Sequence, residues 1–228
     1  PKTNAPMNWP ARAWPRSRPE PMAAAALLDF ASVLIFALTG ALVASRAQLD
    51  VVGFAFLANL TAMGGGTFRD LLLDRHPVFW IAEPLYLGVA TGAALLVFFT
   101  AHLLESRYRT LIWLDAVALS VAVAAGAGIA QAEGAPAPVV LVMGVMTGCL
   151  GGLLRDVVAN EVPLLLKQGE PYATCALGGA LALWTATALG LAPVFAALLC
   201  AGVTFALRAS SLAFGWHIPV YRPRPPRQ

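Results

Sequence analysis

The sequence predicts an all-α membrane protein with seven transmembrane helices, arranged as 3+3 inverted repeats plus one further helix. This prediction rests on the composition, on the length of the uncharged segments and on an internal repeat. Of the 228 residues, 59% are hydrophobic and 12% are charged, whereas soluble domains contain about 45–50% apolar and about 25% charged residues. A chain of this size has too much surface to hide so many apolar side chains in one soluble core. The composition therefore excludes a soluble enzyme, a nucleic-acid-binding protein and a disordered chain.

The membrane spans follow from the uncharged segments, because a spanning helix needs roughly 20 mostly apolar residues. Such segments occur at 30–45, 51–68, 84–104, 116–132, 134–154 and 171–207. The last would form about 55 Å of helix at ~1.5 Å per residue, nearly twice a bilayer core of ~30 Å. Gly190 and Pro193 supply a break, so we divide it into spans at 171–190 and 192–208. The total becomes seven.

Both ends of the chain are basic and rich in proline. Residues 1–21 contain four basic side chains and one acidic side chain, and residues 209–228 contain three arginines and no acid. We expect 1–21 to be an extension outside the fold, either disordered or added to a natural start at Met22. We expect 209–228 to be a basic tail, which leaves 22–208 as the membrane domain.

An internal repeat relates the two halves of this domain at a constant offset of 86 residues. Each copy contains Gly-Gly-x-x-Arg-Asp-x6-Pro, once from Gly65 and once from Gly151. Further identities at the same offset join Asp29 to Asp115, Gly40 to Gly126, Thr61 to Thr147 and Tyr86 to Tyr172. Each copy spans three helices, an odd number, so the second copy must be inverted. Repeat 1 then occupies about 27–105, repeat 2 about 113–191 and the seventh helix about 192–208, an arrangement typical of transporters.

The orientation in the membrane follows from basic residues in the short connections, which favour the cytoplasmic side. One side of the membrane holds five of them: Arg46, Arg107, Arg109, Lys167 and Arg208. We therefore expect a cytoplasmic C-terminus and an N-terminus outside. The basic residues of 1–21 argue against this orientation.

Two glycine clusters lie inside the second and fifth predicted helices, at Gly64-Gly65-Gly66 and Gly151-Gly152. Glycine destabilises a helix interior by about 1 kcal/mol relative to alanine, so we predict a kink or an unwound turn at each cluster. An unwound turn would free backbone carbonyls, which can replace the hydration shell of a cation. The alternative is close helix packing through small residues.

Two Arg-Asp pairs follow these clusters, Arg69-Asp70 and Arg155-Asp156. Neighbouring residues on a helix point about 100° apart, so we expect no pairing within each dipeptide. We predict crossed ion pairs between the repeats, Arg69 with Asp156 and Arg155 with Asp70. Charges at this depth usually face a protein interior or a water-filled cavity. They either line a pathway or lock the repeats together, and the same residues can do both.

Other polar residues have less specific interpretations. Asp29 and Asp115 begin apolar segments, where a carboxylate can complement a helix N-terminus. The hydroxyls of Thr61, Thr67 and Thr147 lie near the glycines and can face a permeating ion or bond their own helix.

The sequence offers no set of residues for chemistry on a substrate. The three cysteines and two histidines of the membrane domain lack the spacing of a metal site and are expected to have no such role: Cys149, Cys175, Cys200, His76 and His102. No nucleophile–base set, phosphate-binding loop or dinucleotide motif occurs. We expect neither a metal, a cofactor nor enzyme activity.

The doubled motif, with Pro77-Val78-Phe79-Trp80 after the first copy and Glu161-Val162-Pro163 after the second, resembles the prokaryotic trimeric intracellular cation (TRIC) channel family over about 25–208. The resemblance implies a homotrimer in the inner (plasma) membrane of a prokaryote, with one pore per protomer lined by helices 2 and 5. It also implies permeation of monovalent cations, chiefly potassium with sodium as a second candidate. The glycine clusters would be the pore kinks, and Arg69 and Arg155 would lie beside the pathway. The Lys-Glu-Val element that animal relatives carry on helix 4 is absent from that segment.

Three functions stay open at this stage. The first is a passive potassium-permeable channel. The second is a secondary transporter of a small solute such as glycine, because inverted repeats suit alternating access and related bacterial proteins are linked with that role. The third is a membrane scaffold whose repeats only pack.

Overall fold

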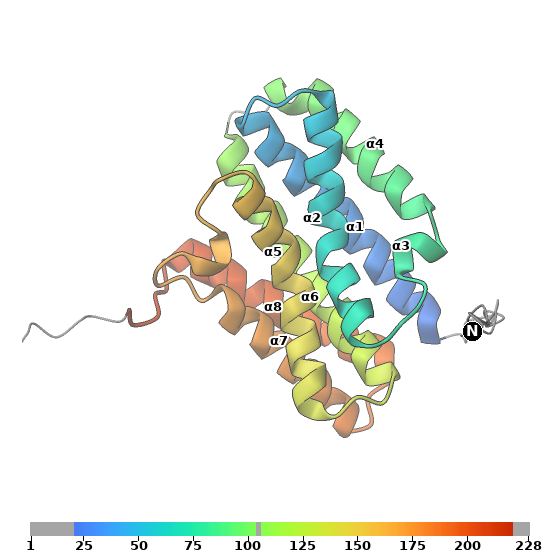
Figure 1. Ribbon diagram of the computed structural model, residues 1–228. Helices are drawn as coiled ribbons and strands as arrows, with labels where there is room; N and C mark the ends of the chain where they lie inside the picture. The colour runs from blue at the N-terminus through green and yellow to red at the C-terminus, as the bar shows by residue number, and fades with distance from the viewer. Residues whose placement is uncertain (1–20, 104–105, 221–228) are drawn as a thin grey trace, which may run out of the picture.

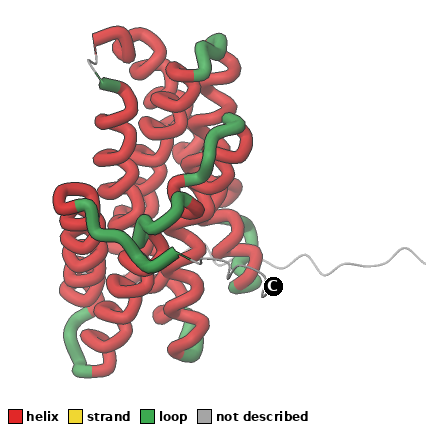
Figure 2. Tube along the Cα trace, turned by 90° about the vertical axis from the view of Figure 1, so that its left-hand side faces the viewer, coloured by secondary structure: helices red, strands yellow, loops and turns green. Residues whose placement is uncertain are grey.

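The computed structural model describes the backbone of residues 21–103 and 106–220, and the side chains from residue 27 onward within these ranges. All regular structure in this part of the chain is helical, which confirms the predicted all-α fold (Figures 1 and 2). The elements are α1 (Pro21–Arg46), α2 (Val51–Leu72), α3 (Phe79–Ala82), α4 (Leu85–Thr100), η1 (Ala101–Leu103), α5 (Arg107–Ala132), α6 (Ala137–Val158), η2 (Leu164–Leu166), α7 (Tyr172–Ala188) and α8 (Pro193–Phe214). The predicted extension at 1–21 falls outside the described residues except for Pro21.

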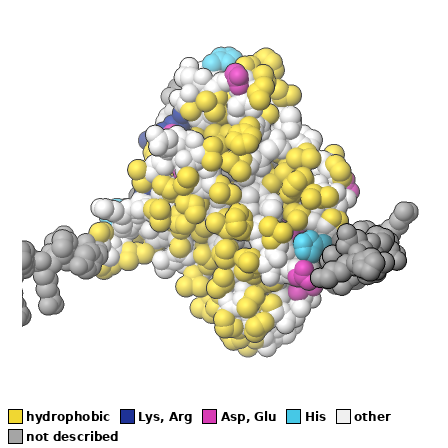
Figure 3. Space-filling model, viewed as in Figure 1, with side chains coloured by type: hydrophobic (Ala, Val, Ile, Leu, Met, Phe, Trp, Pro, Cys, Tyr) yellow, Lys and Arg dark blue, Asp and Glu magenta, His cyan; other side chains and the backbone are white. Residues whose placement is uncertain are grey.

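Within the described residues, six helical segments are long and apolar enough to cross a membrane: α1 from Leu27, α2, α4 continued by η1, α5, α6 and α8. The protein is therefore an integral membrane protein with several apolar spans. The remaining long helix, α7, has 17 residues, which corresponds to about 26 Å at ~1.5 Å per residue. Apolar side chains cover most of the face seen in Figure 3, and the few charged ones lie toward its edges.

The break expected in the last apolar segment is confirmed. Helix α7 ends at Ala188, Gly190 has a φ of +83° and α8 begins at Pro193. The boundary at 208 is wrong, because α8 continues to Phe214. There Gly215, with a φ of +65°, ends the helix in the left-handed conformation that glycine adopts most readily.

The 86-residue offset holds for whole elements. Helices α1 and α5 begin and end 86 residues apart, and so do α2 and α6. In repeat 1, α1 packs on α2 and α4; in repeat 2, α5 packs on α6 and α7. The repeats meet through α1 with α5 and through α2 with α6, and α8 packs on α5 and α7.

The crossing of α2 and α6 shows that the second repeat is inverted. A Cβ atom on Gly151 would lie 2.5 Å from the carbonyl oxygen of Thr61, and one on Gly65 would overlap the carbonyl oxygen of Thr147. From Thr61 to Gly65 along α2, the facing residues on α6 therefore run backwards from Gly151 to Thr147. Since α2 and α6 are equivalent helices in an antiparallel crossing, the two units have opposite orientations (Figure 1).

The same contacts explain the glycine clusters. Both helices continue without interruption through Gly64–Gly66 and Gly151–Gly152, so the prediction of an unwound turn is wrong. The structure agrees with the alternative, in which the missing side chains allow two helices to approach closely. Whether the helices bend at these glycines stays a prediction.

Candidate functional site

A buried charge network lies beside the α2–α6 crossing in repeat 1. The guanidinium of Arg69 donates to both carboxylate oxygens of Asp29 on α1, at 2.7 and 3.1 Å. Its Nε donates to Asp70 Oδ1 at 2.9 Å, and the ring of Phe79 lies 5.6 Å from its guanidinium carbon. We call Asp29, Arg69 and Asp70 the first charge network.

The first charge network also holds the segment that follows α2. The second oxygen of Asp70 accepts a hydrogen bond from the backbone N–H of Phe79 at 2.9 Å, which fixes the start of α3. Arg75 lies 3.5 Å from the first oxygen of Asp70. Since a buried carboxylate needs partners for its lone pairs, this segment completes the network rather than merely connecting two helices.

The second charge network repeats this arrangement 86 residues later with Asp115, Arg155 and Asp156. Arg155 donates to Asp115 Oδ1 at 2.8 Å and to Asp156 Oδ1 at 2.7 Å. The other oxygen of Asp156 accepts from the backbone N–H of Leu164, at 2.9 Å. A hydrogen bond from a backbone N–H to the aspartate of the Arg-Asp pair therefore anchors η2, as it anchors α3.

Two further bonds extend the second charge network. The hydroxyl of Tyr172 donates to the second oxygen of Asp115 at 2.7 Å. Arg155 also donates to the hydroxyl of Thr39 on α1, at 3.0 Å, and so reaches into repeat 1. Its Nη2 has no hydrogen-bond partner among the described residues.

These networks overturn the predicted crossed pairs. Arg69 pairs with carboxylates of its own repeat, and so does Arg155, including the neighbouring aspartate of each dipeptide. The long arginine side chain turns its Nε back toward the adjacent carboxylate, although the two Cβ atoms point apart. The interpretation of Asp29 and Asp115 as helix-start residues is also wrong, because both lie well inside their helices.

Crossed ion pairs between the repeats do exist, at other residues. Arg46, the last residue of α1, lies 3.1 Å from Glu161, which follows α6. At the other end of the bundle, Arg75 lies 3.1 Å from Glu133, which follows α5. Arg75 and Glu161 occupy equivalent positions 86 residues apart, and their partners Arg46 and Glu133 lie 87 residues apart, so the two pairs occupy nearly equivalent places with their charges exchanged.

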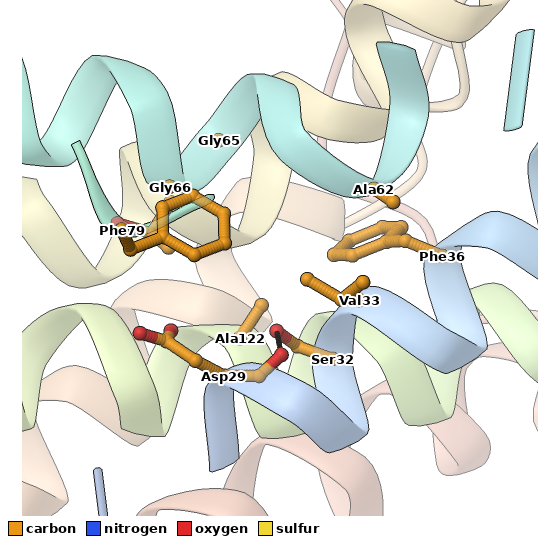
Figure 4. A pocket seen from close by; sticks show the side chains of 10 residues that line it. Asp29, Ser32, Val33, Phe36, Ala62, Gly65, Gly66, Phe79 and Ala122 are labelled. Carbon is orange, nitrogen blue, oxygen red and sulfur yellow. Dashed lines mark hydrogen bonds between the residues drawn. The ribbon is translucent and has the colours of Figure 1, made fainter. Parts of the chain in front are cut away.

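A small cavity separates the first charge network from repeat 2 (Figure 4). Its volume is about 10 Å³, space for about one water molecule. It is lined by side chains and backbone of α1, α2, α3, α5 and α6: Asp29, Ser32, Val33, Phe36, Ala62, Gly65, Gly66, Phe79, Ala122 and Thr147. The α2–α6 crossing and the carboxyl-bearing Asp29 thus border one small space.

The predicted threonines have different environments. Thr61 donates to the carbonyl of Leu57 in its own helix at 2.6 Å. Thr67 donates to the carbonyl of Met63 and accepts from the indole N–H of Trp80. Thr147 lines the cavity, and its hydroxyl has no partner among the described residues.

Sequence reasoning missed a third buried arginine, Arg208. We counted it among the basic residues of a connection, whereas it lies inside α8 and is 1% exposed. It donates to Glu170 at 2.8 Å, and its guanidinium carbon lies 5.0 Å from the centre of the Tyr172 ring. The signal available in the sequence was the apolar segment Leu212-Ala213-Phe214 before Gly215, which can continue the helix beyond Arg208.

Comparison with known proteins assigns the family. A family model described as "Glycine transporter" matches the chain twice, at 26–102 and at 112–188. The crystal structure of the TRIC trimeric intracellular cation channel orthologue from Rhodobacter sphaeroides covers 84% of this chain and 98% of that one, with a TM-score of 0.81 and 44% identity. The chain belongs to the prokaryotic TRIC channel family. The two family-model matches lie 86 residues apart, so each structural repeat of this TRIC protein matches the family model by itself.

Bacterial relatives of this TRIC protein extend across most of its length. A UPF0126 membrane protein of Vibrio cholerae is 38% identical over 84% of this chain and 80% of its own. The UPF0126 inner membrane protein YadS of Escherichia coli K12 is 38% identical over 67% of this chain and 74% of its own. The resemblance seen in the doubled motif is thereby confirmed for the membrane domain as a whole.

Proposed function

We propose that this TRIC protein is a passive channel for monovalent cations, chiefly potassium with sodium as a second candidate, with one pathway in each protomer between α2 and α6. The observation that carries the proposal is its likeness, at 44% identity, to nearly the whole of a solved protein described as a cation channel. The proposal includes bends at the glycine clusters and a pathway lined by the threonines and charged pairs predicted from the sequence: Thr61, Thr67, Arg69, Asp70, Thr147, Arg155 and Asp156.

The charge balance supports cations as the permeating species. Each buried arginine is bonded to two carboxylates of its own network, so the three side chains carry a net charge of −1. The arginines therefore do not present an uncompensated positive charge to the α2–α6 crossing. A negative site in a low-dielectric interior attracts cations and repels anions.

We further propose that α7 is the seventh span, with the N-terminus outside and the C-terminus in the cytoplasm. The basic connections support this orientation. The Escherichia coli relative is described as an inner membrane protein, and the Rhodobacter sphaeroides orthologue is described as trimeric. We infer the same membrane and a homotrimer for this chain.

The second candidate function is a secondary transporter of glycine. The description of the family model favours it, and inverted repeats are compatible with alternating access. An amino-acid carrier and a channel differ in a measurable way, because a carrier exchanges its solute across the membrane without unitary currents.

Purified protein in liposomes and planar bilayers tests the proposal. We expect potassium flux with unitary currents that reverse at the potassium equilibrium potential, and none from protein-free bilayers. Exchange of labelled glycine without unitary currents would support the carrier and exclude the channel. If neither potassium currents nor glycine exchange is detected, the membrane scaffold is the remaining function.

A matched pair of variants tests the position of the pathway. A Cβ on Gly64 would meet the flexible end of Leu154 at 2.6 Å, at the α2–α6 contact, whereas one on Gly88 of α4 meets nothing within 4 Å. We expect Gly64→Ala to change the unitary conductance and Gly88→Ala to leave it unchanged. Equal conductance in both variants would place the pathway elsewhere.

A further inference from the structure

The segment between α6 and α7 that contains η2 is held by helices on both sides of it. We call residues 164–171 the connecting segment. Besides its bond to the second charge network, this segment has two side-chain anchors. Lys167 donates to the hydroxyl of Tyr108 at the start of α5, and Glu170 accepts from Arg208 of α8 at 2.8 Å. Helices α5 and α8 therefore fix the connecting segment from outside.

The chain returns to the connecting segment after α8 (Figure 1). Gly215 ends the helix, and the backbone N–H of Ile218 donates to the carbonyl oxygen of Gly169 at 2.8 Å. A Cβ atom on Gly169 would lie 3.2 Å from Nδ1 of His217. Gly169 has a φ of +79°, a conformation that glycine adopts readily, and its missing side chain leaves room for the returning chain. We call residues 215–218 the C-terminal strap.

The C-terminal strap is held by few interactions. Among the described residues, the bond from Ile218 is its one backbone hydrogen bond beyond the end of α8. Trp216 is 53% exposed and Ile218 is 41% exposed. Segments with few buried contacts and exposed backbone bonds open locally while the rest of the protein stays folded. The strap can therefore detach from Gly169 without the unfolding of a helix.

This contact belongs to repeat 2 and is not a feature of the repeated unit. Helix α8 follows both repeats and packs on α5 and α7, which are helices of repeat 2. The residue equivalent to Gly169 is Glu83, which has a side chain and a φ of −133°. The left-handed glycine thus occurs at the copy of this position that the chain after α8 contacts.

Both ends of the connecting segment lead into the second charge network. Its first residue, Leu164, donates its backbone N–H to Asp156 in the last turns of α6. The residue that follows it, Tyr172, donates to Asp115, and the ring of Tyr172 lies 5.0 Å from the guanidinium carbon of Arg208. A displacement of the connecting segment consequently changes bonds to two carboxylates of this network and the surroundings of the α6 end.

We propose that the C-terminal strap is a releasable restraint on the connecting segment and, through it, on the end of α6. The attached strap slows conformational changes there, and the detached strap permits them, as in other order–disorder switches. The restraint itself does not depend on the proposed function. Its effect on gating rests on that function, because α6 is one of the two helices assigned to the pathway.

A disulfide tests whether the strap lies on the connecting segment. A Cβ atom on Gly169 would lie 3.5 Å from Cβ of His217, within the range of about 3.5–4.5 Å that a disulfide bridges. We expect Gly169→Cys with His217→Cys to crosslink under a mild oxidant, measured by mass spectrometry. Gly190→Cys with His217→Cys is the matched control, because Gly190 is also left-handed but has nothing within 4 Å of its Cβ position. Equal yields in the two pairs would overturn the proposal.

Hydrogen exchange in detergent gives a readout that does not depend on conduction. Oxidation of the Gly169→Cys, His217→Cys protein should slow amide exchange in residues 164–171, and reduction should reverse this. Ile218→Pro removes the donor N–H and should speed exchange there by about twofold to tenfold, the change that one hydrogen bond implies. Ile218→Ala retains the N–H and should exchange like the wild type. Exchange that ignores both the crosslink and Ile218→Pro would exclude the restraint.

Recordings in planar bilayers test the effect on gating. Oxidation of the Gly169→Cys, His217→Cys protein should lower the rate of opening and closing without changing the unitary conductance, and a reductant should restore it. The wild type, whose cysteines are buried, controls for the reagents. Currents whose gating ignores the crosslink would leave the channel and overturn the regulation by the strap. Crosslink-dependent exchange without currents in any variant would leave the restraint and exclude the channel.

Discussion

The two charge networks share the same three ionic side chains, but they differ in their surroundings. In repeat 2, Tyr172 closes the second oxygen of Asp115, and Thr39 ties Arg155 to the opposite repeat. Asp29 of the first network borders a cavity, and the residue of repeat 2 that corresponds to Thr39 is Ala125. The second network is thus fully buried and linked across the interface, whereas the first borders a small cavity.

This difference shows which side chains a duplicated unit retains and which of them change. The ion pairs and the loop anchors are the same in both copies, because a charge left alone in an apolar interior is strongly destabilising. The uncharged neighbours are free to change, and Phe36 against Ala122 is such a change. The two repeats therefore keep the same ionic side chains and differ in how those side chains are packed.

The largest expected effect comes from neutralising the sealed carboxylate. Asp115→Asn removes the charge that pairs with Arg155 and presents an amide to a site built for two donors. We expect the free energy of unfolding to fall by about 3–5 kcal/mol. Asp29→Asn should lose less, because water can enter the adjacent cavity. Chemical unfolding in detergent compares the two, and equal losses would contradict the distinction between a sealed and an open network.

An intermediate effect is expected at the α2–α6 crossing. Gly65→Ala places a methyl group against the backbone carbonyl of Thr147, which cannot move aside as a side chain can. We expect a loss of about 1–3 kcal/mol, the range for overpacking. Gly88→Ala, in open space on α4, should be neutral or stabilising by up to about 1 kcal/mol. Thermal unfolding of both variants measures the difference, and a tolerated Gly65→Ala would mean that the two helices are not held in contact.

The smallest effect is expected at the crossed ion pairs. Arg46 and Glu161 are partly exposed, and such pairs contribute about 0.2–1 kcal/mol. Arg46→Glu should therefore destabilise slightly, and the added change Glu161→Arg should restore stability. A double-mutant cycle gives the coupling energy. No recovery would show that the pair does not join the repeats.

The architecture could be predicted from the sequence because it depends on periodic features. The identities at a constant offset located equivalent helices, and the apolar segments located the spans. The break at Gly190 and Pro193 was predictable from local chemistry, since glycine accepts a positive φ and proline begins a helix well. The family resemblance had the same origin, in the doubled Gly-Gly-x-x-Arg-Asp motif.

The partners of the charges could not be predicted in the same way. Uncharged segments were used to define helices, so each helix appeared to start after its nearest charge. Helix α5 instead begins at Arg107, where Ser106 accepts a hydrogen bond from the backbone N–H of Arg109. Asp115 consequently lies inside the helix and in reach of Arg155. The recurrence of Asp29 as Asp115 was a usable signal, because an acid retained in both copies of an apolar helix needs a basic partner.

The pairing of each arginine within its own repeat also has a consequence for how the protein is made. All carboxylate partners of Arg69 come earlier in the chain or immediately after it. Its charge can therefore be compensated while the ribosome is still translating repeat 1, before any residue of repeat 2 exists. Each three-helix unit can then enter the lipid with its ionic groups already matched. A single unit with this property could have existed alone and assembled as an antiparallel pair before the gene was duplicated.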